Sequence, residues 1–307
     1  MRGFLVANVF AAHRPLERAP GRSKLKIAER KGRERMKRLL VSMAGICLLW
    51  NAVKAGAQVP SFNSASLNGT YVFRLHANGV STNTYSYSMV GVLTANGSGA
   101  ITGGQFDLNN GAGASPQTPM TLTGTYTVNS DGRGTLTLNV AGANLPNHTN
   151  GNLVLSLALV SSSRAEMVEV TANETARGVM QQQVGTPSLA TISGAYAVSG
   201  VAFQHNVPAS AVPPPSPADF AGQVTADGMG TISGTVDAGA VDAQQASMPV
   251  AGTFAFTSGR GLGTNSGVSV VVYPVDNTTA YVMSLGPATT LTSGDAPEVL
   301  GTFELQH

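Results

Sequence analysis

Beyond residue 57, the chain of 307 residues contains no lysine, no cysteine and no tryptophan. The single cysteine, Cys47, and the single tryptophan, Trp50, both lie in the N-terminal segment. A body without cysteine has no disulfides and no thiol chemistry, so packing and hydrogen bonds must stabilise it.

Positive charge is also scarce in the body of the chain. Residues 1–57 hold 13 of the 18 Lys+Arg and three acids, a net charge of +10. From Gln58 onward five arginines face 13 acids, a net charge of −8. The five arginines are Arg74, Arg133, Arg164, Arg177 and Arg260. So few cations cannot neutralise a phosphate backbone, which argues against nucleic-acid partners.

The N-terminal segment has the parts of a secretory signal. Basic Met36–Arg38 precedes an apolar run, Leu39–Val53, and a small-x-small site ends at Ala57. The sequence predicts cleavage between Ala57 and Gln58 and export, as a secreted or periplasmic protein. The apolar run is shorter than the roughly 20 residues of a membrane span, and a retained N-terminal anchor is the alternative.

Residues 1–35 are basic and precede a second possible start at Met36. They are either an unusually long charged region or an upstream extension that is not translated. No later segment is apolar enough to predict a membrane span in the mature chain.

The remainder of the chain repeats itself. TANGSGAITGG (94–104) corresponds to TADGMGTISGT (225–235), and LVLSLALVSSSRAEMVEV (153–170) corresponds to VSVVVYPVDNTTAYVMSL (268–285). Such matches predict two β modules of normal domain size after the leader. The predicted division is 1–57 leader and signal peptide, 58–66 short N-terminal stretch, 67–183 module 1, 184–191 linker and 192–307 module 2.

Hydrophobicity alternates with a period of two, as in β-strands. TLTGTYTV (121–128) alternates threonine with inward residues, and YVFRL (71–75) places Tyr71, Phe73 and Leu75 inward with Arg74 outward. LVLSLALV (153–160) is apolar on both faces and predicts a strand covered on both sides. Strand-like runs lie near 67–76, 85–95, 99–107, 120–128, 133–140, 151–160, 164–171 and 175–183.

Eight sequential strands with short connections favour an antiparallel meander. The fold class predicted is all-β, with two tandem meanders closed into eight-stranded lipocalin-like barrels, because closure removes exposed sheet edges. β-Sandwiches are the alternative. An outer-membrane barrel is a weaker one, because the mature chain has few aromatic residues for interfacial girdles.

The motifs L-x-G-x-Y-x-F, T-A-[DN]-G-x-G-x-I-[ST]-G and G-T-Y-x-V-x-x-D-G-R-G-T-L-T-L resemble a repeat module of exported acidobacterial proteins. The resemblance covers nearly all of 67–183 and, more loosely, 192–307, where SGRGLG replaces DGRGTL. It implies export and tandem β modules, and it implies no chemical activity.

The glycine-rich loops are interpreted as turns. TANGSGAITGG lacks the spacing and the following helix of a phosphate loop, and Asn96-Gly97 predicts a hairpin turn with positive φ angles. Residues 129–134 partly match the sequence pattern of a calcium-binding loop, but Arg133 occupies a position that needs an oxygen ligand. No metal and no cofactor are predicted.

Two arginines recur in G-R-G contexts, and two aspartates recur after the preceding strand. We predict structural ion pairs within each module, Arg133 with Asp107 and Arg260 with Asp237. An arginine that binds a ligand carboxylate in a barrel mouth is the functional alternative.

Catalytic motifs are absent from the sequence. His76, His148, His205 and His307 are scattered and are interpreted as lone surface or loop histidines. Glu166 and Glu169 lie three apart on a predicted strand and therefore on opposite faces, which suits no acid–base pair.

Three functions stay open. The favoured one is an exported non-catalytic β-module protein, structural or interacting with an unknown protein or cell-surface partner. The second is binding of a small apolar ligand inside the barrels, and the third is an enzyme of unrecognised type. Large inward residues that fill the barrels favour the first, and a cavity of several hundred Å³ favours the second.

Overall fold

The structure, a computed structural model, describes most of the two modules. The described residues are 61–80, 84–109, 118–140, 142–143, 145, 148, 151–169, 174–203, 218–240, 243–265, 268–287 and 298–306. The predicted leader, the cleavage site Ala57–Gln58, His205 and His307 lie outside these residues. Within the described ranges, no helix is long and apolar enough to cross a membrane.

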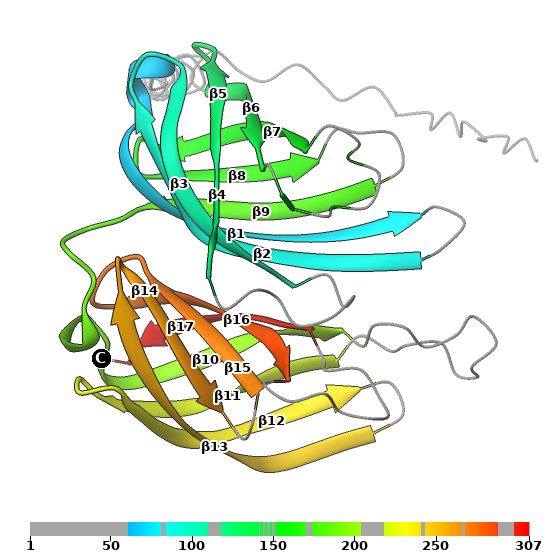
Figure 1. Cartoon of the computed structure of the whole chain (residues 1–307), viewed down its shortest axis with the longest axis vertical. Coiled ribbons are helices and arrows are strands. Elements are labelled where there is room, and N and C mark those ends of the chain that lie inside the picture. Colours follow the sequence, from blue (N-terminus) through cyan, green and yellow to red (C-terminus); the bar gives the residue numbers. More distant parts are fainter. Residues whose placement is uncertain are drawn as a thin grey trace, which may run out of the picture. The chain divides into compact units, whose positions relative to one another are not determined.

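The first module is a closed antiparallel barrel (Figure 1). A short 3-10 helix, η1 (Ser64–Ser66), precedes it. Its strands are β1 (Asn68–Val80), β2 (Thr84–Asn96), β3 (Ala100–Asn109), β4 (Met120–Thr121), β5 (Thr123–Val128), β6 (Arg133–Asn139), β7 (Asn152–Ser161), β8 (Arg164–Glu169) and β9 (Glu174–Gln182). β1 pairs with both β2 and β9, and β3 pairs with β2, β4 and β5, so the sheet closes on itself.

The second module repeats this plan. The 3-10 helix η2 (Leu189–Thr191) precedes the strands, as η1 does in the first module. Its strands are β10 (Ser193–Phe203), β11 (Ala218–Asp227), β12 (Thr231–Ala240), β13 (Ala243–Thr257), β14 (Arg260–Asn265), β15 (Val268–Pro274), β16 (Thr279–Pro287) and β17 (Glu298–Leu305). They form a closed barrel in sequence order. In the first barrel β4 and β5 are separated by a single residue and both pair with β3, so together they fill one strand position. The predicted tandem eight-stranded barrels are therefore confirmed, and the sandwich alternative is not.

The alternation of residue types fills each barrel interior. In the first barrel, Tyr71, Phe73 and Tyr126 are 0%, 1% and 3% exposed and belong to one core cluster. A separate core in the second barrel includes Tyr196, Ile232 and Phe303. The predicted inward positions of both strand patterns are confirmed.

The prediction for β7 is wrong on one face. Its inward leucines are buried, except that Leu159 near the end of the strand is partly buried, but the outward Ala158 is exposed and Val160 is 62% exposed. Small and β-branched side chains on the outer face of this strand therefore face solvent. Apolar residues on that face do not mean that another element packs against it.

The glycine-rich stretch is the turn between β2 and β3, as predicted, but its geometry differs in detail. The positive φ angles belong to Gly97 (75°) and Gly99 (96°), not to Asn96. The Asn96 side chain instead accepts hydrogen bonds from the backbone N–H groups of Ser98 (2.8 Å) and Ala100 (3.0 Å). The glycines supply the left-handed backbone, and the asparagine stabilises it as an Asx turn.

Candidate functional site

A hydrophobic cluster joins the outer surfaces of the two barrels, and Pro60–His307 forms one compact unit. Val72, Val90 and Val179 point outward from the first barrel and are at most 8% exposed. They cluster with outward side chains of β15, β16 and β17, including Tyr273 and Met283. These strands therefore carry apolar side chains on both faces, one face toward their own barrel core and the other toward the first barrel.

A buried ion pair lies beside this cluster. Arg260 donates from Nε (2.7 Å) and Nη2 (2.6 Å) to the two carboxylate oxygens of Asp107, and the Tyr273 hydroxyl donates to the same carboxylate at 2.7 Å. The side chains of Arg260 and Asp107 are 7% and 0% exposed. This is the bidentate geometry that makes a buried arginine–carboxylate pair specific.

Burial and the Asp107 charge together set the protonation of this network. Burial, followed by the neighbouring carboxylate, raises the pKa of Tyr273 well above its ordinary value. Burial, the largest single effect, lowers the pKa of Arg260, but the hydrogen bonding and charge of Asp107 together with Tyr273 outweigh it, and the pKa is raised overall. Both side chains therefore stay protonated donors at neutral pH.

The predicted pairing within modules is wrong. Arg133 pairs with Asp131 at 2.7 Å on the surface, its side chain 79% exposed. Asp237 is exposed and accepts from the backbone N–H of Ser247 at 2.6 Å. Asp107 points away from its own barrel core and meets Arg260, so the structural pair joins the two modules.

The turns explain why the two arginines differ. Arg260 follows a two-residue turn in which Ser258 and Gly259 both have positive φ, the type I′ pattern. Arg133 follows a longer turn, 129–132, in which the Asp131 side chain accepts from its backbone N–H. The different turn lengths present the two arginines in different surroundings despite the shared G-R-G motif.

Further polar contacts extend the interface between the barrels. Asn109 donates to the backbone carbonyl of Ser284 at 2.8 Å, and the Tyr281 hydroxyl donates to Gln181. The guanidinium of Arg74 lies 5.4 Å from the ring centroid of Tyr281, a cation–π distance. Arg74 is outward, as predicted, but the second barrel half-covers it, and burial lowers its pKa.

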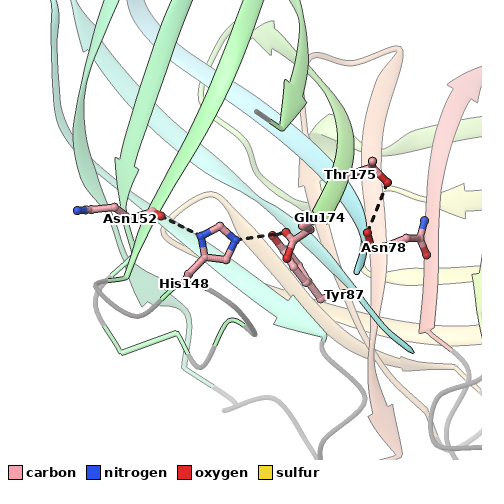
Figure 2. Close-up of polar contacts among 6 residues, drawn as sticks. All are labelled: Asn78, Tyr87, His148, Asn152, Glu174 and Thr175. Atoms are coloured by element: carbon pink, nitrogen blue, oxygen red, sulfur yellow. Dashed lines mark hydrogen bonds and ion pairs between the residues drawn. The ribbon is translucent and has the colours of Figure 1, made fainter. Parts of the chain in front are cut away.

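A second cluster lies at one end of the first barrel (Figure 2). The His148 ring places Nε2 3.3 Å from Oε1 of Glu174 and Nδ1 3.0 Å from the backbone carbonyl of Asn152. The Tyr87 hydroxyl donates to the same Glu174 oxygen. The side chains of His148 and Glu174 are only 3% and 1% exposed.

Strand alternation positions the carboxylates of this cluster. Glu174 begins β9 on its inward face, while the adjacent Thr175 is exposed and its hydroxyl donates to the backbone carbonyl of Asn78 (3.4 Å; Figure 2). Glu169 ends β8 on the inward face, and Glu166 is exposed, so their predicted placement on opposite faces is confirmed. One ligand atom each of His148, Glu169 and Glu174 lies within 4.8 Å of the others.

Sequence reasoning missed this cluster. The sequence predicts a lone surface or loop histidine at His148, but its imidazole is buried, and hydrogen bonding to Glu174 raises its pKa. A signal was present, because both Glu169 and Glu174 occupy positions where the alternation calls for an apolar inward residue. The other histidine of the described chain, His76, is buried and bonds Ser88 at 3.0 Å.

The comparisons with known proteins identify no family. No family model matches the chain, and no curated protein matches it significantly. A mutant of transferrin binding protein B from Haemophilus parasuis Hp5 shares 7% identity and a TM-score of 0.29, covering 78% of this chain and 76% of that one. A protein of unknown function from Nostoc punctiforme has 8% identity and a TM-score of 0.26, with 79% and 98% covered.

Kievitone hydratase from Nectria haematococca shares 9% identity and a TM-score of 0.21, with 81% of this chain and 94% of that chain covered. Likenesses this weak support no inference about function. The barrels are established by the strand pairing of the chain itself.

Proposed function

We propose that this is an exported, non-catalytic protein whose working unit is the pair of barrels, acting in surface structure or in binding another macromolecule. The observation that carries the proposal is the side-chain packing of the barrel interiors together with the buried surface between the barrels. Both features favour a rigid molecule over one built around a cavity for an internal ligand.

The filled interior supports a structural role over apolar-ligand binding. Tyr71, Phe73 and Phe106 occupy the centre of the first barrel and are at most 1% exposed. A pocket of the second barrel, lined by residues such as Ile232, Phe254 and Phe303, has a volume of about 20 Å³. Ligand pockets generally measure about 300–1,000 Å³, so this one has room for little more than a water molecule.

The interface supports the view that the two barrels act together. The charged pair Arg260–Asp107 is buried between them, and the Asp107 carboxylate accepts a further hydrogen bond from Tyr273. Charged groups are rarely buried at a contact that opens and closes freely, because each opening and closing would change their solvation. We therefore propose that the outer surfaces of a fixed two-barrel body carry the interaction.

Native mass spectrometry of the full chain tests the internal-ligand alternative. The protein is expected to carry no co-purified organic molecule, before and after extraction with organic solvent. Phe106→Ala is the positive control, because it opens space in the first core, and a small apolar probe should bind this variant and not the wild type. A stoichiometric organic ligand in the wild type would overturn the structural role.

Export is tested by fractionation of expressing cells. Exported protein is expected to begin at Gln58, and deletion of residues 1–57 is expected to keep the chain in the cytoplasm. Deletion of residues 1–35 is the matched control and should leave export intact, since Met36–Arg38 retains the charged region. An exported chain that lacks residues 1–57 would refute the localisation.

A further inference from the structure

The inward face at one end of the first barrel changes from apolar to acidic. β8 directs Ala165 and Met167 and then Glu169 inward, and β9 directs Glu174 and then Ala176. The two glutamates are 6% and 4% exposed. Two carboxylates buried this close together are costly to keep ionised, so a shared proton or a bound cation stabilises them.

The His148 ring is held between two oxygen acceptors. A backbone carbonyl only accepts, so Nδ1 of His148, 3.0 Å from the Asn152 carbonyl oxygen, carries a hydrogen. In the neutral ring, Nε2 then has a lone pair, which is directed at Oε1 of Glu174. That oxygen already accepts a hydrogen bond from Tyr87. An attractive contact between Nε2 and Oε1 therefore requires a proton or a metal ion.

The spacing of the two atoms also fits shared ligation of a metal ion. A charge-assisted N–H···O⁻ hydrogen bond is about 2.7–2.9 Å long. Two ligand atoms on one tetrahedral zinc, each at about 2.0–2.2 Å from the metal, are about 3.4 Å apart. The observed separation of Nε2 and Oε1 is 3.3 Å.

Charge balance leads to the same conclusion. A divalent cation held by a neutral imidazole and two carboxylates leaves the cluster neutral, which is the arrangement that a buried site tolerates best.

We propose that His148, Glu169 and Glu174 bind a divalent transition-metal ion of the zinc type at this end of the first barrel. The Asn152 carbonyl fixes the ring through Nδ1, and Tyr87 orients the Glu174 carboxylate, as outer-shell partners of metal ligands do. Nitrogen combined with carboxylate oxygen suits zinc and its neighbours, whereas Ca²⁺ prefers six to eight oxygen ligands. Three protein ligands leave a coordination position for water or for a carried molecule.

Equilibrium dialysis and calorimetry with Zn²⁺ on the full chain test the proposal. One Zn²⁺ is expected to bind in this cluster, and Ca²⁺ is not expected to bind there. His148→Ala and Glu169→Gln should abolish this binding, and Tyr87→Phe should weaken it by about 10–100-fold. Glu166→Gln is the matched control, because Glu166 lies on β8 but is exposed and paired with Arg164.

A measurement on the wild type makes the test independent of variant folding. Zn²⁺ is expected to shift the ¹⁵N resonance of Nε2 of His148, while Nδ1 of this ring stays protonated; the His148 signals are assigned by their absence from the His148→Ala spectrum. The proposal is overturned if the wild type binds no Zn²⁺ up to about 0.1 mM. It is equally overturned if only other histidines shift, or if Glu169→Gln binds Zn²⁺ as tightly as Glu166→Gln does.

Discussion

At the scale of single residues, Asp107 shows how strongly context decides what a charged side chain does. Its carboxylate accepts from Arg260 twice and from Tyr273 once, in a site closed to solvent. All three of these hydrogen bonds come from the other module. Removal of one partner would leave a buried charge without compensation, which costs far more than the loss of a surface contact.

We predict that Arg260→Ala lowers the free energy of unfolding by about 3–5 kcal/mol, the usual cost of breaking a buried ion pair on one side. Asp107→Asn should also destabilise the protein, because the amide cannot match the bidentate geometry. Urea denaturation followed by circular dichroism measures both effects.

Arg133→Ala is the matched control for this prediction. Arg133 lies in the same G-R-G motif, but its pair with Asp131 is exposed, and such pairs contribute little. Equal destabilisation by the two arginine variants would show that the buried pair has no special role.

At the scale of the structural elements, the turn between the second and third strands of each module is built in the same way from different residues. Asp227 accepts from the backbone N–H groups of Met229 (2.7 Å) and Thr231 (2.9 Å), as Asn96 does for its own turn. These hydrogen bonds lower the pKa of Asp227 below its ordinary value of 3.8. The stability of the turn at Asp227 therefore depends on pH, whereas the stability of the turn at Asn96 does not.

We predict that the Asp227 turn loses stability in acid. Because the folded-state pKa is depressed, the stabilisation is complete above the unfolded value and is lost as pH falls through the folded value. Asp227→Asn should flatten the pH dependence of the urea midpoint between about pH 5 and pH 2.5, since an amide accepts the same bonds without titrating.

The reciprocal change, Asn96→Asp, provides the comparison. It should add acid sensitivity to the first barrel. An unchanged pH profile in both variants would contradict the role of these side chains in the turns.

The strands were predictable because period-two alternation is local. Residues 121–128 and 71–75 gave the correct faces, and the turns fell between them as expected. The ion pairs were not predictable, because Asp107 and Arg260 are 153 residues apart, and only packing of one barrel on the other brings them together.

The candidate site was partly readable from the sequence. Glutamates at inward positions 169 and 174 break the alternation, which marks the end of the barrel as polar. The position of His148 was not predictable, because a loop histidine has no periodicity that would fix where its ring lies. Only the structure joins it to Glu174.

At the scale of the whole molecule, we predict that the two barrels unfold in one cooperative transition. Val90→Asp would place a charge in the apolar interface, where Val90 is fully buried. It should destabilise the protein strongly and separate the calorimetric transition into two, because each barrel keeps its own core.

Val168→Asp is the control for this variant. Val168 also points outward from the first barrel but is 54% exposed, so its transition should remain single. If Val90→Asp also gave a single transition at an unchanged midpoint, the interface would not couple the barrels.

The interface uses a different set of strands from each copy, β1, β2 and β9 from the first and β15, β16 and β17 from the second, with only the closing strands β9 and β17 in common. In the repeat alignment, Val90 corresponds to Ala221 of the second module, and Tyr281 corresponds to Glu166 of the first. Both Ala221 and Glu166 are exposed. Comparing outward residues between the copies would therefore have located the interface in the sequence, which inward residues could not do.

This asymmetry has a consequence for assembly. A head-to-tail contact between equivalent modules repeats without end unless something stops it, and unlimited repetition produces fibres. In the second module, the surface equivalent to the first module's side of the interface is the outer face of β10–β12. It carries exposed polar side chains such as Gln223, Thr235 and Asp237, where the first module has valine and a buried aspartate. The outer face of the second module therefore does not repeat the apolar surface with which the first module binds its neighbour, and a further copy of the module could not pack there through the same contacts.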